Sequence, residues 1–319
     1  MIGRFEELVT VFGGGGFVGR YVVEILLRSG VRVRVASRNP RRDYFIQPLA
    51  QVGQLGFVEA YVTNADSVRR AINGASAVIN LVGIFGRRMP AVHVGGAKHI
   101  ADAASDAGAE ALVHISAMGA DPKSPSSYGR TKSEGELAVR KAFPKATIIR
   151  PSLVFGPEDN LTNRFAGLAR LLPIMPVIAA GRKFQPVYVR DLAQAIATAA
   201  LDPRKHGGTT YEIGGPQVLT MKELHLAILE LSGQEAALVE MPDVFASLLS
   251  RFGWLPGAPL TRDQWLMLGR DNVQSGEHPG LEAFGIRPTP LDAVGFEWLS
   301  RFRKGGTFAG RHIEMTATS

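Results

Sequence analysis

The sequence predicts an α/β protein built on a doubly wound parallel sheet, with a smaller C-terminal lobe on the substrate side. Strand-like apolar runs alternate with helical segments through the first half of the chain, beginning with residues 9–12 and 17–29. The run 77–82 is apolar apart from Asn80, as expected of a strand that is buried on both faces. Together these two observations favour a parallel sheet with helices on both sides.

A glycine turn joins the first strand to the first helix. Gly13, Gly16 and Gly19 have the spacing G-x-x-G-x-x-G, in which the first glycine allows a tight turn, the second admits phosphate oxygens and the third permits close helix packing. Amides at the helix N-terminus would then face a pyrophosphate. A purely structural glycine turn is the alternative, but the β-α-β context favours a Rossmann-type nucleotide site.

The end of the second strand, 31–36, indicates which dinucleotide is bound. An acidic residue usually accepts a hydrogen bond from the ribose 2′-hydroxyl there, whereas this chain has Arg38. A guanidinium can pair with a 2′-phosphate, so NADP(H) is expected, with NAD(H) as the alternative. Arg41 and Arg42 are interpreted as a solvated basic turn.

The remaining elements follow in order. Further strands are expected at 57–62, 77–82, 111–116 and 147–150, with helices at 67–73, 92–107 and 127–143. Beyond Pro151 the pattern loosens, with proline- and glycine-rich joins. We therefore expect an NADP(H)-binding domain over 1–165, with 182–202 returning to the sheet, and a smaller lobe over 166–181 and 203–319.

Composition restricts the class of protein. The 319 residues include no cysteine, which excludes disulfides and thiolate metal sites. His93 and His99 have the wrong spacing for a zinc helix, so no metal is expected. The apolar runs are too short and too often broken to span a membrane. The net charge of +7 is compatible with an anionic cofactor, an acidic membrane surface or acidic partners, while the scattered arginines argue against nucleic acid.

A second chemical motif lies on the predicted helix 127–143. Tyr128 and Lys132 are four residues apart, so they share one helix face, and Ser116 stands at the end of the strand 111–116. The ammonium is expected to lower the pKa of the phenol and to bind the nicotinamide ribose, while Ser116 holds a substrate oxygen. Tyr-x-x-x-Lys alone is common in helices, but here it follows a dinucleotide motif.

At this point the chain resembles the extended or atypical short-chain dehydrogenase/reductase family over residues 8 to 230. The resemblance implies catalytic roles for Ser116, Tyr128 and Lys132. It implies cofactor contacts for Gly13, Gly15, Gly16, Phe17, Val18, Arg38, Leu81, Val82, Gly83, Tyr128, Lys132, Pro151, Leu153 and Val154.

A narrower resemblance covers more of the chain. The segments 142–160, 163–165 and 185–191, continuing to 285–289, are similar to the dehydrogenase-like accessory subunits of respiratory complex I and their bacterial relatives. This resemblance leaves two functions open: an oxidoreductase or epimerase-like enzyme acting on an apolar carbonyl or hydroxyl compound, and a non-catalytic NADPH-binding subunit of a membrane-bound NADH:quinone oxidoreductase. The sequence indicates no oligomeric state.

Two positions depart from the family pattern. His93 stands where many extended members have an asparagine that orders a proton-relay water, so it is either a relay or a packed histidine. Tyr61, with Val62 beside it, stands where an adenine-binding aspartate is usual, and it either stacks on adenine or packs at the rim. Gly83, Gly86, Gly95 and Gly96 suggest a flexible lid over the cofactor or close packing. Asp191 is expected to cap a helix, and Asp159 to serve as a turn or cap residue.

The segment 241–254 has apolar residues at helical spacing and ends in aromatic residues that include Phe252 and Trp254. Ordinary lobe core is one interpretation, and a docking surface for a membrane or a partner subunit is the other. Together with the charge and the resemblance to complex I subunits, this segment predicts a cytoplasmic protein that can attach to the cytoplasmic face of the inner membrane.

Overall fold

The structure, a computed structural model, describes residues 7–251 and 261–304 and divides the chain into two compact units. The first unit consists of Met1–Ser152, Val189–Gly214 and Gln274–Arg287, and the second of Leu153–Tyr188, Gly215–Val273 and Pro288–Ser319. Within the described residues, no helix combines the length and the apolar character that crossing a bilayer requires.

The first unit contains a seven-stranded parallel sheet in the order β11-β6-β5-β4-β1-β2-β3. Its strands are β1 (Leu8–Phe12), β2 (Arg32–Ser37), β3 (Leu55–Glu59), β4 (Ala77–Asn80), β5 (Ala111–Ile115), β6 (Thr147–Pro151) and β11 (Thr210–Ile213). In the middle of the sheet Val11 pairs with Val35 on one side and with Ile79 on the other. The predicted fold class, a Rossmann-type α/β protein, is confirmed.

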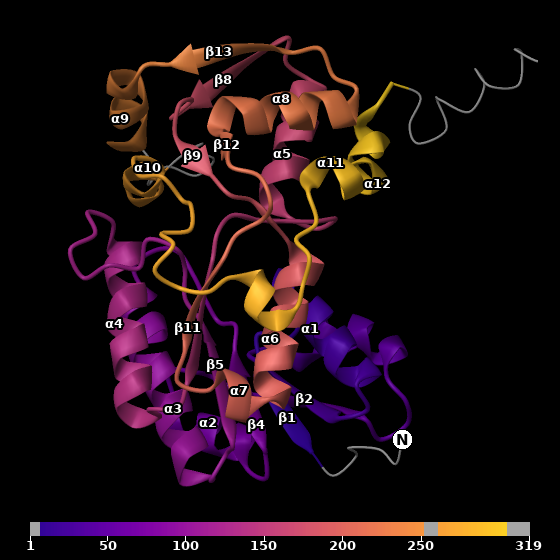
Figure 1. Cartoon of the computed structure of the whole chain (residues 1–319), viewed down its shortest axis with the longest axis vertical. Coiled ribbons are helices and arrows are strands. Elements are labelled where there is room, and N and C mark those ends of the chain that lie inside the picture. Colours follow the sequence, from indigo (N-terminus) through magenta and orange to yellow (C-terminus); the bar gives the residue numbers. More distant parts are fainter. Residues whose placement is uncertain (1–6, 252–260, 305–319) are drawn as a thin grey trace, which may run out of the picture. The chain divides into compact units, whose positions relative to one another are not determined.

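Helices cover both faces of this sheet (Figure 1). On one face α2 (Ala65–Ile72), α3 (Ala97–Asp106) and α4 (Ser127–Ala142) pack side by side, and on the other α1 (Phe17–Arg28) packs against α6 (Val189–Leu201). The unit also contains the short helix α7 (Pro203–His206) and the 3₁₀ segment η3 (Leu281–Phe284).

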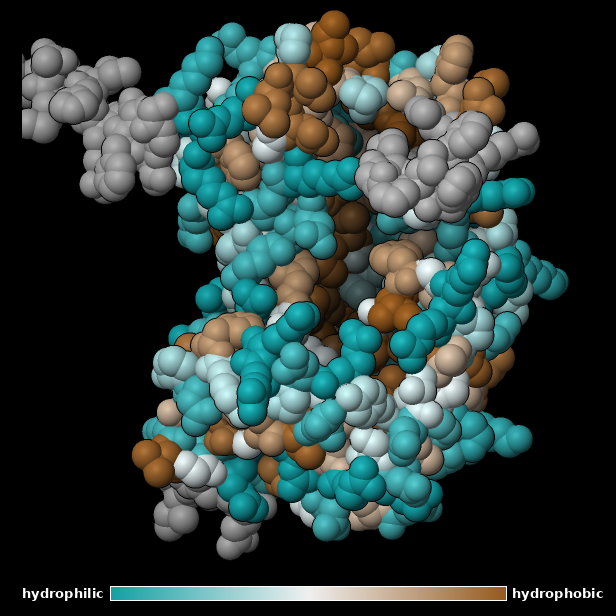
Figure 2. Space-filling model, turned by 180° about the vertical axis from the view of Figure 1, so that it is seen from behind, coloured by the Kyte–Doolittle hydropathy of each residue, from teal (hydrophilic) through white to brown (hydrophobic). Residues whose placement is uncertain are grey.

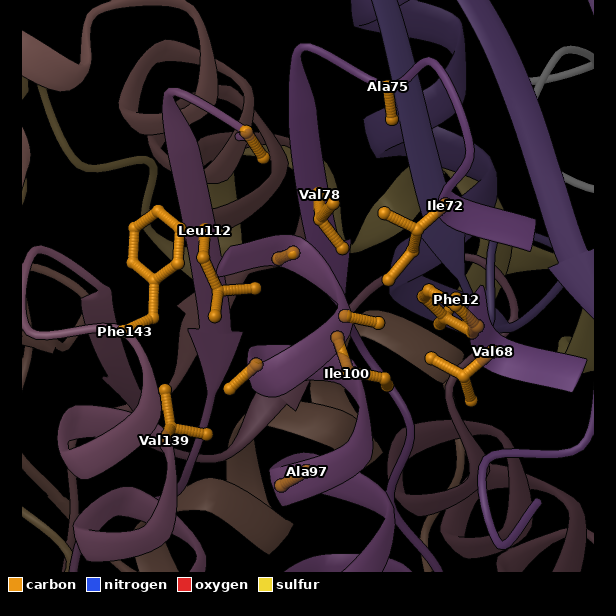
Figure 3. Packing of buried hydrophobic residues seen from close by; sticks show 14 of the residues in the cluster. Phe12, Val68, Ile72, Ala75, Val78, Ala97, Ile100, Leu112, Val139 and Phe143 are labelled. Carbon is orange, nitrogen blue, oxygen red and sulfur yellow. The ribbon is translucent and has the colours of Figure 1, made fainter. Parts of the chain in front are cut away.

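Aliphatic side chains from the sheet and the helices interlock beneath α3. Ile100 of α3 lies close to Val78 and Phe12, while Leu112 faces Val139 of α4 (Figure 3). All five side chains are at most 1% exposed. Burial of this kind is the main contribution to the stability of a fold, at about 1.5–3 kcal/mol for each large apolar side chain.

Three predicted boundaries differ from the structure. β3 ends at Glu59, so Tyr61 and Val62 follow the strand instead of ending it. The helix expected over 92–107 begins as a π-helix, η2 (Pro90–Gly96), and continues as α3, so Gly95 and Gly96 are helical and do not belong to a lid loop. Asp191 lies inside the first turn of α6, which begins at Val189, and is not its cap.

The domain boundaries also need correction. β11 pairs with β6 in parallel, which places residues 203–214 in the first unit and not in the smaller lobe. Residues 274–287 return to the first unit as well: the Ser275 amide and hydroxyl donate to the buried Glu212 carboxylate over 2.7 and 2.8 Å, and Phe284 stacks on His206. These contacts are distant in sequence, so local patterns could not reveal them.

The second unit is built from short elements. They are β7 (Val154–Phe155), α5 (Asn160–Ala169), β8 (Ile174–Ile178), β9 (Lys183–Phe184), β10 (Val187–Tyr188), β12 (Leu219–Thr220), α8 (Met221–Ser232), β13 (Ala237–Met241), α9 (Asp243–Arg251), α10 (Arg262–Leu268), α11 (Leu291–Val294), α12 (Phe296–Leu299) and η4 (Ser300–Phe302). The segment η1 (Pro40–Leu49) belongs to the first unit. Asp159 caps α5 as expected, accepting from the Thr162 amide.

Apolar side chains are exposed on the second unit (Figure 2). β8 and β13 form a parallel pair in which Pro176 lies beside Val239. Met175 and Val177 are buried beneath it, whereas Ile174 and Val239 are 58% and 52% exposed. Parallel sheets are normally covered on both faces, so an open apolar face on such a pair is unusual.

Candidate functional site

The glycine turn lies between β1 and α1. Gly13 has a φ of +81°, which glycine adopts without strain, and its carbonyl accepts the Gly16 amide over 3.0 Å. Gly16 is the N-cap residue of α1; no side chain in the described structure caps it, and the first helical turn has no acid. The first amides of a helix have no partner within it, so those of Phe17 and Val18 are available to an anion.

Two other glycines of the turn permit close packing. A Cβ atom added at Gly19 would lie 2.2 Å from the Gly13 carbonyl oxygen, so α1 can approach the turn only without a side chain there. A Cβ atom at Gly15 would lie 1.9 Å from Oδ1 of Asp43, a buried residue of η1. Asp43 was not predicted from the sequence, because its contact with Gly15 depends on how η1 folds back.

A groove of about 510 Å³ extends from this turn along the carboxyl ends of β1, β2 and β4. Its lining residues are Gly13, Gly16, Ala36, Ser37, Arg38, Ala60, Tyr61, Val62, Thr63, Leu81, Val82, Gly83, Ile84, Arg88 and Val92. This lining contains two arginines and no acid. The groove therefore favours an anionic ligand, and it lies where parallel α/β sheets bind nucleotides.

The groove contains Arg38, Tyr61, Val62 and the residues 81–83 that were predicted from the sequence. Arg38 is exposed at its wall, directly after β2. Tyr61 is 45% exposed, and its hydroxyl donates to Glu59 over 2.7 Å, so its ring lies at the rim. Val62 packs against Gly96, where an added Cβ would lie 2.9 Å away.

Ser37 was not among the predicted residues. Its Oγ is buried and has no hydrogen-bond partner among the described residues, although it lines the groove beside Arg38. A hydroxyl in that state can donate to a phosphate or ribose oxygen. Its position directly before Arg38 was the signal that could have identified it.

The predicted catalytic residues come from two adjacent elements. Ser116 follows β5, is 2% exposed, and has an Oγ without a partner in the described part of the chain. Tyr128 lies in the first turn of α4, whose N-cap is Ser126, and Lys132 follows one turn later. The Lys132 ammonium donates to the carbonyl of Ile115 over 3.0 Å and lies 5.8 Å from the Tyr128 ring centre. These contacts bring the three residues together.

The Tyr128 ring lies between two other rings. Phe85 stacks on it with centres 4.8 Å apart and an angle of 20° between the planes, and His93 meets it edge-on at 5.4 Å. Burial raises the pKa of Tyr128 to about 12. The expected lowering of this pKa by Lys132 is therefore wrong: the loss of solvation dominates, while the ammonium bonds to the Ile115 carbonyl.

Lys132 itself is 3% exposed, and an added Cβ at Gly83 would lie 3.4 Å from its Nζ. Burial lowers its pKa to about 8, and the nearby Glu136 offsets part of this effect. At neutral pH the Lys132 side chain is still mostly protonated and therefore charged. It therefore provides a cation next to Gly83 at the groove, where a ribose hydroxyl could bind.

Two of the predicted cofactor contacts, Leu153 and Val154, belong to the second unit, where Val154 pairs with Val187. Their cofactor role stays a prediction. Pro151 ends β6 in the first unit, and its carbonyl accepts the Met118 amide over 3.0 Å. Among the described residues no three His, Asp or Glu side chains gather to hold a metal ion.

Comparison with known proteins agrees with this geometry. The model of the NAD dependent epimerase/dehydratase family matches residues 9–214, and the chain belongs to that family. It is 35% identical over 305 residues to NADH dehydrogenase [ubiquinone] 1 alpha subcomplex subunit 9 from Mus musculus, covering 93% of this chain and 80% of that protein. It is 32% identical over 203 residues to ceramide reductase from Caulobacter vibrioides, covering 61% and 62% of the two chains.

Two solved structures have the same fold. The NADPH-dependent quinone oxidoreductase from Escherichia coli, in complex with NADPH, aligns with a TM-score of 0.73 at 18% identity over 90% of this chain and 98% of that one. The triphenylmethane reductase from Citrobacter aligns with a TM-score of 0.74 at 19% identity over 91% and 99%. The chain therefore has an NAD(P)-binding fold, as predicted.

Proposed function

We propose that this protein is an NADP(H)-dependent reductase that acts on an apolar carbonyl compound. The observation that carries the proposal is the gathering of Ser116, Tyr128 and Lys132 next to a groove whose lining has two arginines and no acid. Gly13, Gly16 and the first amides of α1 would hold the pyrophosphate. Arg38 and Ser37 would hold the 2′-phosphate, which an acid at that position would repel.

The bound cofactor supplies the hydride that the carbonyl carbon accepts. Ser116 donates a hydrogen bond to the carbonyl oxygen, and the Tyr128 phenol transfers its proton to that oxygen as the alcohol forms. A phenol with a pKa of about 12 remains protonated at neutral pH, so it is ready to act as an acid.

The apolar character of the substrate follows from the surroundings of the phenol. Phe85 is 57% exposed although it lies directly on Tyr128, so an apolar ring faces solvent at the reacting group. A ligand that covers this ring gains from removing it from water. The test is to follow NADPH absorbance with a panel of quinones, aromatic aldehydes and long-chain ketones. Turnover with none of them would contradict the reductase proposal.

A second function is supported by a different observation. The similarity to the mouse complex I subunit extends over 93% of the chain, which is more than a nucleotide-binding domain requires. The second unit also exposes Ile174, Val239, Val244, Phe245 and Leu248. In this proposal the protein is a nucleotide-binding accessory subunit attached to a membrane-bound NADH dehydrogenase on the cytoplasmic face. Affinity purification from native membranes, with mass spectrometry of bound nucleotide and co-purifying subunits, tests it.

A further inference from the structure

His93 lies at an unusual place in the fold. It is 2% exposed and belongs to the π-helix η2, through which the chain after β4 enters α3. π-Helical turns are rare and occur frequently at functional sites. α4 packs closely against this turn. A Cβ atom added at Gly135 would lie only 2.3 Å from the His93 carbonyl oxygen, so the contact requires a glycine there.

The imidazole joins two separate elements. Nε2 lies 3.1 Å from the Ile84 amide in the loop after β4, and Nδ1 lies 3.0 Å from Oγ1 of Thr131 on α4. Because an amide can only donate, Nε2 is the acceptor, and the neutral ring carries its hydrogen on Nδ1. Thr131 accepts this hydrogen and donates its own to the Ser127 carbonyl over 2.8 Å.

Both ring nitrogens are therefore engaged, which argues against the proton-relay interpretation. Burial, followed by the charge of Lys132, lowers the pKa of His93 to about 4, so the ring stays neutral at physiological pH. A protonated ring would place a second N–H against the Ile84 amide. His93 is suited to holding parts in place and not to carrying protons.

The elements that His93 joins are those that enclose the phenol. Phe85, which stacks on Tyr128, directly follows Ile84, whose amide the imidazole fixes. The same imidazole meets the edge of the Tyr128 ring. The loop is also held at Val82, whose amide donates to Asn80 over 3.1 Å, but that contact lies three residues before Phe85.

We propose that His93 is a positioning residue for Tyr128, tying the loop after β4 to α4 so that Phe85 stays on the phenol ring and excludes water from it. This inference rests on the proposed acid role of Tyr128. Without the imidazole, the loop loses its anchor beside Phe85, and water reaches the phenol.

The test measures ionisation of Tyr128 directly and needs no substrate. Tyrosinate absorbance is recorded from about pH 8 to about pH 11.5, and the contribution of Tyr128 is obtained by subtracting the matched Tyr128→Phe protein. In the parent protein Tyr128 should remain un-ionised over most of this range. In His93→Phe, which keeps the ring and loses both hydrogen bonds, its pKa should fall by at least about one unit toward the ordinary value of about 10.

His225→Phe is the matched control, because His225 is also 2% exposed and hydrogen-bonded but lies in the second unit. His225→Phe should lose about as much stability as His93→Phe but should leave the Tyr128 titration unchanged. If His93→Phe does not fold, Thr131→Val is measured in its place and should shift the pKa in the same direction. This variant removes the Nδ1 partner and the bond to the Ser127 carbonyl, and it keeps the imidazole. An unchanged Tyr128 titration in the folded variant would overturn the inference.

The proposed function can fail separately. A Tyr128→Phe protein that reduces substrate at the parent rate would refute the acid role, whatever the titration shows. Conversely, suppose that Tyr128 titrates in His93→Phe as it does in the parent protein, and that Tyr128→Phe is inactive. That combination would refute only the positioning role of His93.

Discussion

The Lys132 ammonium donates to the backbone carbonyl of Ile115, 3.0 Å away, and thereby links α4 to the end of β5. Ser116 directly follows Ile115, so one hydrogen bond fixes the distance between the helix that carries Tyr128 and the strand that carries the serine. The groove, the cation and the phenol thus belong to one unit of the fold.

Arg38→Ala should weaken the binding of NADPH far more than the binding of NADH. A charge-assisted hydrogen bond contributes about 1.5–3 kcal/mol, so NADPH binding should weaken about tenfold to a hundredfold while NADH binding hardly changes. Titration calorimetry measures both. Arg41→Ala is the control, since Arg41 is exposed but does not line the groove. Equal losses for both nucleotides would contradict the role of Arg38.

Tyr128→Phe should retain NADPH affinity and lose nearly all reductase turnover. The ring and its stack with Phe85 remain, and only the proton route is removed. Stopped-flow absorbance separates binding from hydride transfer. Tyr61→Phe removes a hydroxyl at the rim and should leave turnover close to that of the parent.

Lys132→Met should stabilise the protein at pH 7 while impairing ribose binding. The pKa of Lys132 is about 8 in the folded protein and about 10.4 when unfolded. At pH values between these two, the unfolded chain binds more protons than the folded protein, so this lysine makes the free energy of unfolding rise with pH. Below about pH 8 the lysine is charged in both states, and burial of its charge destabilises the folded protein. We expect the variant to gain about 1–2 kcal/mol in urea denaturation at pH 7 and to lose this gain as the pH approaches 10.

The exposed Lys98→Met is the control for that measurement and should show little change at any pH. A Lys132→Met protein that is less stable than the parent at pH 7 would mean that the lost bond to Ile115 outweighs the relief of burial.

Gly19→Ala should damage the glycine turn. The added methyl group would meet the Gly13 carbonyl and the Gly14 backbone, which cannot rotate away. We expect a loss of about 1–3 kcal/mol in unfolding free energy and at least a tenfold weaker nucleotide affinity. Gly56→Ala, where nothing lies within 4 Å of the added atom, should change the affinity little. Thermal unfolding with and without NADPH measures both effects.

The pair of substitutions Phe245→Ser and Leu248→Ser should release the protein from native membranes if α9 is a docking surface. Both side chains are more than half exposed, so folding should be little affected. Leu137→Ser, on an exposed position of α4, is the control. Phe252 and Trp254 of the predicted segment lie outside the described residues. Membrane fractionation at low and high salt gives the result, and retention of the double variant would argue against docking through α9.

Local patterns were sufficient to predict the order of strands and helices from β1 to β6 and the residues at the strand ends. Gly13, Arg38 and the residues 81–83 could be found because parallel strands bring their carboxyl ends to one edge. The π-helix at 90–96 and the contact of Asp43 with Gly15 depend on tertiary packing and leave no local signal. The predicted lowering of the Tyr128 pKa was wrong for the same reason, since burial of the ring, which raises this pKa, depends on tertiary packing.

The return of residues 274–287 to the first unit has a consequence for synthesis on the ribosome. All seven strands of the nucleotide-binding sheet have been made by residue 213, yet the Glu212 carboxylate still lacks its Ser275 partner. The sheet can form early, but a buried carboxylate at its edge stays incompletely paired until some sixty further residues have emerged. A chain that stalls or is cut between these points would carry that defect permanently.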